Sequence, residues 1–325
     1  MMKLLKAIGI PAALLLVGAT LCYALDIRVA YFTDSAFQPT LIKGEAFPKT
    51  LIDATGEEYL LSKPPERIAS ITLGADEILS DLIDERRIVG VTYLAEDEDV
   101  SNIPNKFADQ IQRIHGEVEE ILALEPDLVF VASYTRAETV RLLLGAGIPV
   151  VRLSGYSSYA ELEQNIILVS QATGSEPRAN AILDELREYV RGIKDRTKGL
   201  PTPRVLFYNL NGYTSGVDTI VDEMIQLAGG YNVVRDVGIS GTQKISQEMA
   251  MGLEPDVILM SGWSELSVSQ PSELLMENPS WQQVPAIQNN RVYDLRGYWV
   301  LSVSQYSWNG IGQIAQRLHP GAFNP

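Results

Sequence analysis

Two short apolar runs, residues 128–132 and 257–260, are preceded by the same local pattern in different parts of the chain. Each run follows a Leu-Glu-Pro-Asp segment and, before that, a stretch whose apolar positions suit one face of a short helix. Proline disfavours the α conformation at the residue before it, so the helix should end there. The runs are too continuously apolar for half-exposed strands and indicate strands that are covered on both faces.

The repeated pattern extends towards the N-terminus of each run. Arg67 and Arg204 each lead a β-rich segment, which is followed by Gly-x-Asp (from Gly74 and from Gly216) and an apolar-periodic helix. The order is the same both times: strand, loop, Gly-x-Asp helix, then the Glu-headed helix, Leu-Glu-Pro-Asp and a strand. Two matches in one order predict a duplicated α/β unit, and therefore two similar lobes.

Strands alternate with helices through both halves, which predicts parallel sheets with helices on both faces. The predicted strands are residues 67–72, 88–91, 128–132, 148–153, 205–208, 257–260 and 291–295, and the predicted helices include 74–84, 136–144 and 305–318. Residues 26–62 form a β-rich lead-in with a turn at Ala54-Thr-Gly56. Gly145-Ala-Gly147 resembles part of a nucleotide-binding loop, but it follows a helix and precedes a strand, so we interpret it as a helix C-cap.

Residues 159–200 are predicted to join the lobes through two helices. The first covers residues 159–172, and the second follows Ser175, a good N-cap, and runs to about residue 198 with Pro177 in its first turn. At 1.5 Å per residue the second helix spans ~35 Å, enough to cross from one lobe to the other. The predicted fold class is therefore α/β: two similar parallel-sheet lobes (25–158 and 201–325) joined by a single long helix, with a ligand cleft between the lobes.

Composition supports a folded two-domain protein and restricts its partners. The 325 residues suit two ordinary domains, and 46% hydrophobic with 21% charged residues is typical of globular proteins. A net charge of −15 argues against nucleic-acid binding, which requires an excess of Lys and Arg. We predict a monomer that binds no nucleic acid.

The N-terminus is typical of a secretory signal. Lys3 and Lys6 precede residues 7–25, which carry no charge, and Cys22-Tyr-Ala24 is an acceptable cleavage site. Residues 1–24 are thus predicted to be a signal peptide and the mature protein to be periplasmic. Lipidation at Cys22 is the alternative, although Leu21 is unusual for a lipoprotein. An uncleaved anchor is also open because these 19 uncharged residues can just span a bilayer.

Polar and aromatic side chains follow the predicted strands at their carboxyl ends, where ligands bind in parallel α/β sheets. Trp281 and Trp308 are instead interpreted as core residues. Two lobes facing each other would line a cleft that suits a large, partly apolar ligand with some negative charge. The predicted ligand-binding residues are Tyr134, Arg136, Tyr156, Tyr208, Tyr213, Trp263, Arg296, Tyr298 and Trp299.

Enzyme signatures are scarce in this sequence. It has two histidines, His115 and His319, and its one cysteine lies in the predicted signal peptide, so a Ser/His/Asp or Cys/His centre is not expected. A His-rich metal cage is excluded for the same reason. We predict no catalytic residue, no resident metal and no cofactor.

Glu119 and Glu248 open equivalent helices of the repeat and should therefore project similarly from the two lobes. A carboxylate at a helix N-terminus is favourable by itself. A matched acidic pair can also bind a matched pair of arginines on a symmetric partner.

Several of these motifs together resemble class III substrate-binding proteins of ABC importers, the ferric-siderophore, haem and cobalamin binders. The resemblance covers Pro64–Pro320 and rests on Glu119-Glu-Ile-Leu-Ala-Leu-Glu-Pro-Asp-Leu-Val, Leu227-Ala-Gly-Gly-Tyr-Asn-Val, Leu253-Glu-Pro-Asp-Val-Ile and Pro285-Ala-Ile-Gln-Asn-Asn-Arg-Val-Tyr293. It implies two lobes bridged by one rigid helix with little closure on binding. It also implies that Glu119 and Glu248 dock on arginines of an ABC permease in the inner membrane.

The resemblance does not select the ligand. Where the family usually reads Ser-Pro-Ser-Ala-Thr-Glu, this chain has Thr72-Leu-Gly-Ala-Asp-Glu77, so ligand contacts there do not carry over. Haem would use Tyr134, Tyr156 or Tyr298 as iron ligand, a siderophore would rely on the arginines, and a corrinoid on the tryptophans. An exported enzyme or a ligand sensor on the same duplicated scaffold remains the alternative function.

Overall fold

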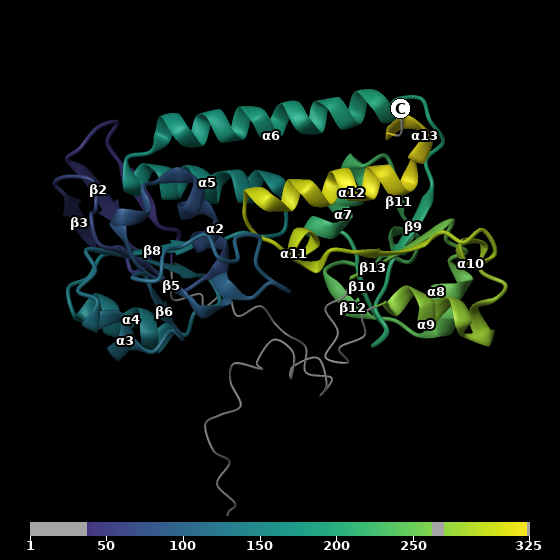
Figure 1. Ribbon diagram of the computed structural model, residues 1–325, viewed down its shortest axis with the longest axis horizontal. Helices are drawn as coiled ribbons and strands as arrows, with labels where there is room; N and C mark the ends of the chain where they lie inside the picture. Colours follow the sequence, from purple (N-terminus) through teal and green to yellow (C-terminus); the bar gives the residue numbers. More distant parts are fainter. Residues whose placement is uncertain (1–37, 262–269, 324–325) are drawn as a thin grey trace, which may run out of the picture.

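The computed structural model describes residues 38–261 and 270–323 of the chain. Two α/β lobes lie side by side, and the long helix α6 (Glu176–Thr197) runs across one side of both (Figure 1). Each lobe has its own parallel sheet. The predicted fold class, two similar parallel-sheet α/β lobes joined by a single long helix, is confirmed. The predicted signal peptide with Cys22 and the predicted ligand residue Trp263 lie outside the described residues.

The N-terminal lobe is built on a five-stranded parallel sheet in the order β6-β5-β4-β7-β8. Its strands are β4 (Ile68–Ser70), β5 (Ile88–Thr92), β6 (Gln112–Ile114), β7 (Leu128–Ala132) and β8 (Val150–Leu153). Its helices are α2 (Leu73–Leu82), α3 (Val118–Ala123), α4 (Ala137–Gly145) and α5 (Tyr159–Thr173), with short 3-10 turns at Glu85–Arg87 and Tyr93–Glu96. An antiparallel sheet of β1 (Leu41–Lys43), β2 (Lys49–Ile52) and β3 (Glu58–Leu61) precedes it, and the predicted turn at residues 54–56 joins β2 to β3.

The C-terminal lobe has a four-stranded parallel sheet in the order β11-β9-β13-β14. Its strands are β9 (Arg204–Phe207), β11 (Tyr231–Asn232), β13 (Val257–Ser261) and β14 (Val292–Leu295), and β10 (Tyr213–Ser215) pairs with β12 (Thr242–Lys244) in a separate antiparallel ribbon. Its helices are α7 (Ile220–Leu227), α8 (Gln247–Gly252), α9 (Pro271–Glu277), α10 (Pro285–Gln288), α11 (Gly297–Val300), α12 (Trp308–Leu318) and α13 (Pro320–Phe323), with 3-10 turns at Val233–Val237, Pro279–Trp281 and Gln305–Ser307.

The repeated Arg and Leu-Glu-Pro-Asp segments form the same structural joint in both lobes. Arg67 Nε and Nη2 donate to the carbonyls of Glu125 and Leu124 at 3.0 and 2.6 Å, at the C-terminus of α3. Arg204 Nη2 donates to the Leu253 carbonyl at 2.9 Å, at the end of α8. The helix must stop at this point, because the glutamate before each proline has a left-handed φ of +46° or +47°. The repeat therefore fixes how each short helix enters its central strand.

The two copies differ in the Gly-x-Asp segment, where our prediction was wrong for the second lobe. Gly74 and Asp76 lie inside α2 as expected, but Gly216 and Asp218 precede α7 instead of opening it. Asp218 has a φ of +61°, and Thr219 is the N-cap, accepting a hydrogen bond from the Asp222 amide at 3.2 Å. The extra β10–β12 ribbon occupies this region, so the chain turns before the helix begins.

Helix α6 begins after Ser175, but this residue does not cap it as we predicted. The Ser175 hydroxyl bonds the Thr173 hydroxyl at 2.8 Å and makes no capping bond to the helix. The apolar face of α6 packs against both lobes, with Ile182 and Leu183 in the N-terminal core and Ile193 in the C-terminal core. Within residues 38–261 and 270–323, no helix has the length and apolar character needed to cross a bilayer.

Candidate ligand site between the lobes

Two tyrosines and a threonine at strand ends form a cluster on the N-terminal lobe. The Tyr134 side chain is 65% exposed, and its hydroxyl lies 3.3 Å from the hydroxyl of Thr72, the N-cap of α2. Its ring centroid lies 6.0 Å from that of Tyr156. Tyr156 donates to the Leu153 carbonyl at 3.0 Å and packs against the cores of both lobes, so it stands at the boundary between them. Burial raises the pKa of the Tyr156 phenol. We name Thr72, Tyr134 and Tyr156 the N-terminal cluster.

A second cluster lies at the end of β14 on the C-terminal lobe. The guanidinium carbon of Arg296 lies 4.8 Å from the centroid of the Trp299 ring, and Arg296 Nη1 donates to the Tyr298 hydroxyl at 3.1 Å. The Tyr298 and Trp299 rings meet edge to face at 5.8 Å. Arg296 is exposed and both rings are half-buried. We name these three residues the C-terminal cluster, and it offers an aromatic face beside a positive charge.

The two clusters are linked through the first turns of α2. We name residues 297–305, which carry Tyr298 and Trp299, the C-terminal arm. Asn102 Nδ2 donates to the Tyr298 carbonyl at 2.7 Å and to Glu77 Oε1 at 2.8 Å. Glu77 Oε2 accepts from the hydroxyls of Ser302, at 2.9 Å, and Ser304. The C-terminal arm of one lobe is thus bonded directly to the other lobe.

The same contact includes a glycine and a second carboxylate. A Cβ at Gly74 would lie 2.6 Å from Val303 Cγ2, so only glycine lets the arm approach α2 this closely. Gln305 Nε2 donates to the Glu77 carbonyl and to Asp81 Oδ2, both at 2.7 Å. Glu77 is 1% exposed, and burial raises the pKa of its carboxyl against the opposing effect of its hydrogen-bond donors. Sequence reasoning missed Glu77 and Asn102, because their bonding partners in the C-terminal arm lie about 200 positions away and share no motif with them.

One predicted ligand residue belongs to the core. Tyr208 is 2% exposed, and its ring packs on Trp281 with centroids 5.3 Å apart. Side chains alternate along β9, so that Val205 and Phe207 join one core cluster while Leu206 and Tyr208 join the other. Our prediction for Tyr208 was therefore wrong, and extending the alternation of the strand by one residue would have revealed it.

The remaining predicted ligand residues are not part of either cluster in the described structure. Arg136 is exposed at the N-cap position of α4. Tyr213 is half-buried at the start of β10, with the Lys244 ammonium 5.9 Å from its ring centroid.

Trp281 and Trp308, interpreted as core residues, are 0% and 2% exposed, and the Trp308 ring meets the Tyr159 ring edge to face with centroids 4.3 Å apart. These two core assignments are confirmed.

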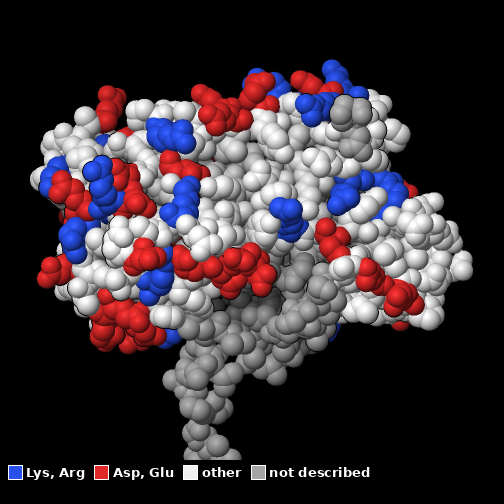
Figure 2. Space-filling view, in the orientation of Figure 1, with Lys and Arg blue, Asp and Glu red and all other residues white. Residues whose placement is uncertain are grey.

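Glu119 and Glu248 occupy equivalent positions on equivalent helices. Each is the second residue of a six-residue helix, α3 or α8, and each is exposed. Both helices lie on the side of the molecule opposite α6, one in each lobe (Figure 1). Acidic side chains gather over α3 at the lower edge of the N-terminal lobe, and a smaller group lies low on the C-terminal lobe (Figure 2). Hydrogen bonds to its own amide and to Ser246 lower the pKa of Glu248, which keeps this carboxylate charged.

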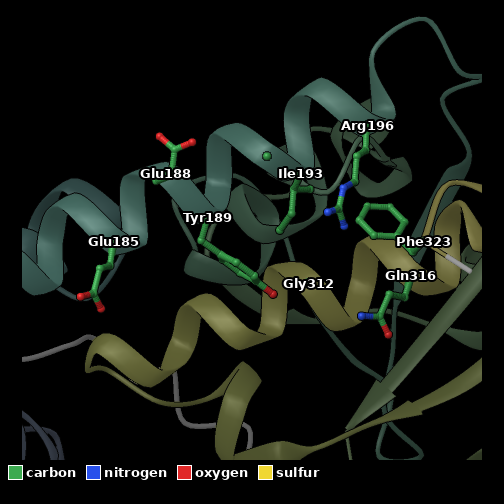
Figure 3. A pocket seen from close by; sticks show the side chains of 9 residues that line it. Glu185, Glu188, Tyr189, Ile193, Arg196, Gly312, Gln316 and Phe323 are labelled. Atoms are coloured by element: carbon green, nitrogen blue, oxygen red, sulfur yellow. The ribbon is translucent and has the colours of Figure 1, made fainter. Parts of the chain in front are cut away.

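A separate pocket of about 330 Å³ lies between α6 and the C-terminal helices (Figure 3). Tyr189 reaches across to Gly312, where a Cβ would lie 1.8 Å from its hydroxyl, and Arg196 stacks over Phe323 at 5.5 Å. None of the predicted ligand residues that the structure describes lines this pocket. Across the part of the chain that the structure describes, no group of three or more His, Cys, Asp or Glu side chains is arranged to hold a metal ion.

Comparison with known proteins agrees with this arrangement. Residues 68–298 match the family described as periplasmic binding protein. The chain is 24% identical over 290 residues to the uncharacterized ABC transporter substrate-binding lipoprotein YvrC of Bacillus subtilis, covering 86% of this chain and 88% of that protein. It is 29% identical over 221 residues to the cobalamin-binding protein of Halobacterium salinarum, covering 66% of this chain and 58% of that protein.

A solved structure supports the same assignment. The periplasmic heme-binding protein RhuT from Roseiflexus sp. RS-1, in its apo form, superposes with a TM-score of 0.67 at 26% identity, covering 79% of this chain and 99% of that one. The family match spans more than half of the sequence and includes both lobes. This chain therefore belongs to the periplasmic binding protein family, as its motifs predicted.

Proposed function

We propose that this chain is the capture subunit of an ABC importer and that its ligand is a tetrapyrrole, haem or a corrinoid. The observation that carries the proposal is that each lobe carries a cluster at its strand ends and that the bonds of Asn102 and Glu77 join the two lobes beside these clusters. A tetrapyrrole presents a broad, partly apolar surface together with anionic or amide groups at its edge. Aromatic side chains from both lobes match the apolar surface, and Arg296 matches a negative group at the edge.

The aromatic character of the site favours a tetrapyrrole over a siderophore. Trp299 and Tyr298 offer ring faces or edges for a broad apolar ligand, and Arg296 contacts both side chains and supplies the positive charge of this cluster. Names of relatives are consistent with this choice, since a cobalamin-binding protein and a heme-binding protein are among them. In this proposal the chain captures and delivers its ligand without catalysis.

The ligand class is tested by calorimetric titration of the chain from residue 25 with haemin, cyanocobalamin and a ferric hydroxamate. We expect one tetrapyrrole to bind with a Kd of about 1 μM or lower, and Trp299→Ala to raise that Kd about tenfold by removing a ring face and its cation–π contact. Tyr298→Phe, which removes the partner of Arg296, should weaken binding. The matched change Tyr208→Phe alters a core phenol and should leave the Kd unchanged. Tight binding of the hydroxamate alone would refute the tetrapyrrole proposal.

We further propose that Glu119 and Glu248 dock the loaded chain on the permease. Their equivalent positions on α3 and α8, both on the side away from α6, suit a partner with two similar halves that each present an arginine. Exposed ion pairs of this kind contribute more to orientation and association rate than to affinity.

Docking is tested by ligand uptake through the cognate permease. The double variant Glu119→Arg with Glu248→Arg should abolish uptake while ligand binding stays intact. The control is Glu185→Arg with Glu188→Arg, which makes the same charge change on the exposed face of α6. Uptake that survives the first double variant, or that fails equally in the second, would contradict the docking proposal.

We also propose that the protein acts outside the cytoplasm, as a periplasmic protein whose residues 1–24 are removed on export. Mass spectrometry of the protein from both the membrane-free and the membrane fraction of the cell decides this point. We expect a mature N-terminus at residue 25 in the membrane-free fraction. A diacylglyceryl group on residue 22 of a protein found in the membrane fraction would instead show that the chain is lipidated.

A further inference from the structure

The C-terminal arm is attached to the N-terminal lobe at its two ends. Near its start, the Tyr298 carbonyl accepts from Asn102 Nδ2 at 2.7 Å. Near its end, Ser302 and Ser304 donate to the carboxylate of Glu77. Trp299 lies between these attachments. The position of the C-terminal cluster is therefore set by residues that belong to the opposite lobe.

The attachment is close to the other half of the candidate site. Thr72, whose hydroxyl contacts Tyr134, is the N-cap of α2, and Glu77 lies in the second turn of the same helix. Helix α2 thus begins directly after Thr72 of the N-terminal cluster and holds the C-terminal arm in its second turn. Because the helix between these two contacts is rigid, it holds them at a fixed separation.

The chemistry of Glu77 suits a positioning role. Its carboxylate is 1% exposed and accepts from the amide and side chain of Asn102, at 2.9 and 2.8 Å, and from two serine hydroxyls. Within the described residues all of these donors are neutral. Burying a carboxylate without a cation is costly, so the group contributes geometry more than stability. The Glu77 carboxylate thus accepts four hydrogen bonds, two from Asn102 of its own lobe and two from serines of the opposite lobe.

We propose that Glu77 is a positioning residue of the ligand site: by holding the C-terminal arm against α2, it fixes the separation of the two aromatic clusters that grip the ligand. This proposal rests on the function proposed above. Without Glu77 the arm samples other positions, and the apparent Kd rises in inverse proportion to the fraction of molecules in which the arm is correctly placed. A fall of the competent fraction to about one tenth raises the Kd about tenfold.

The arm position can be measured without any ligand. The only cysteine of the chain is Cys22, so a version that starts at residue 25 accepts two introduced cysteines, Leu142→Cys on α4 and Leu301→Cys in the arm, both at exposed side chains. Spin labels at these sites report the distance between the arm and the N-terminal lobe. We expect one narrow distance distribution in the parent protein and a broad one in Glu77→Ala. Glu77→Gln keeps one acceptor oxygen and should restore most of the narrow distribution.

Two further variants separate positioning from general destabilisation. Asn102→Ala removes the bond to the Tyr298 carbonyl and should broaden the distribution less than Glu77→Ala, and it serves in place of Glu77→Ala if that variant does not fold. Asp222→Asn changes a carboxylate that is 3% exposed and bonded within the C-terminal lobe to Asn232, Arg235 and Gln226. This control should lower stability and leave the arm distance unchanged.

The same variants are titrated with haemin and cyanocobalamin. For whichever compound binds the parent protein, Glu77→Ala should raise the Kd about tenfold and Asp222→Asn should not. A narrow, unshifted distance distribution in folded Glu77→Ala would overturn the proposal, as would equal broadening in Asp222→Asn. If neither compound binds the parent protein, the proposed ligand class fails, while the distance distributions still decide the role of Glu77.

Discussion

Gly216 stands where the chain turns before α7, and the neighbouring backbone leaves no room there for a side chain. A Cβ at this position would lie 2.1 Å from the Ile239 carbonyl oxygen and 2.5 Å from its carbon. A carbon and an oxygen in contact need about 3.3 Å. The two backbones would therefore have to separate by about 1 Å, since the clashing atoms are backbone and no side chain can rotate away.

The cost can be worked from the bonds that this movement breaks. Val217 donates to the Ile239 carbonyl at 3.0 Å, Gly216 to the Gly241 carbonyl at 2.9 Å, and Gly241 to the Val217 carbonyl at 2.7 Å. At about 0.5–1.5 kcal/mol each, losing two or three of these bonds predicts that Gly216→Ala destabilises the protein by about 1–4.5 kcal/mol. The control is Gly192→Ala in α6, where no atom lies within 4 Å of the added methyl, and which should stabilise by up to ~1 kcal/mol.

Urea unfolding followed by tryptophan fluorescence and by far-ultraviolet circular dichroism measures both changes. All four tryptophans lie between residues 263 and 308, so fluorescence reports on the C-terminal lobe, while circular dichroism reports on both lobes. We expect the midpoint to shift in opposite directions for the two variants with an unchanged m value. A Gly216→Ala protein within about 0.5 kcal/mol of the parent would show that the loop relaxes freely and would refute the reasoning.

Three further changes have clear expected outcomes. Asp76 is fully buried with Oδ1 unpartnered among the described residues, and burial raises the pKa of its carboxyl well above 3.8. The parent protein should therefore lose stability as the pH rises from 3.8 towards the raised pKa of the folded state. At pH 7 Asp76→Asn should be the more stable protein by about 1–3 kcal/mol, a difference that shrinks towards pH 4 in urea titrations. Arg67→Ala should cost about 0.5–1.5 kcal/mol and speed amide hydrogen exchange in α3, and unchanged exchange there would argue against the joint described above. Lys49 is 1% exposed and pairs with Glu176, so Lys49→Met should lower the free energy of unfolding by about 1–3 kcal/mol. Adding Glu176→Gln to this variant should recover part of the loss. If the effects of the two substitutions simply add, the pairing is contradicted.

Much of the fold could be predicted from sequence because its signals are local. The runs of β7 and β13 are buried at every position, so continuous apolar sequence was sufficient to place them. Helix α6 carries its apolar residues at helical spacing over 22 residues, and its limits follow from Pro177 and Gly199. The short strand β6 was missed because its residues Gln112-Arg-Ile114 give no strand pattern, and it forms by pairing with β5.

The candidate site was less accessible to sequence reasoning. Position after a strand identifies an edge of a sheet, and among the residues chosen in this way the Tyr134 ring lies near that of Tyr156 and the Tyr298 ring near that of Trp299. The same rule ignores the face towards which a side chain points, which is why it misplaced Tyr208. The bonds of Glu77 to the C-terminal arm depend on how two lobes meet, and no local pattern records that.

Helix α6 has a consequence for folding as well as for shape. Leu186, near the middle of the helix, contacts both cores, with Ile182 on one side of it and Ile193 on the other. If one lobe unfolds, half of this apolar stripe loses its cover while the other half stays packed. Each lobe therefore adds to the stability of its neighbour, and we expect a single cooperative unfolding transition in place of two. By the same reasoning, either lobe expressed alone with α6 would carry an uncovered apolar surface and aggregate.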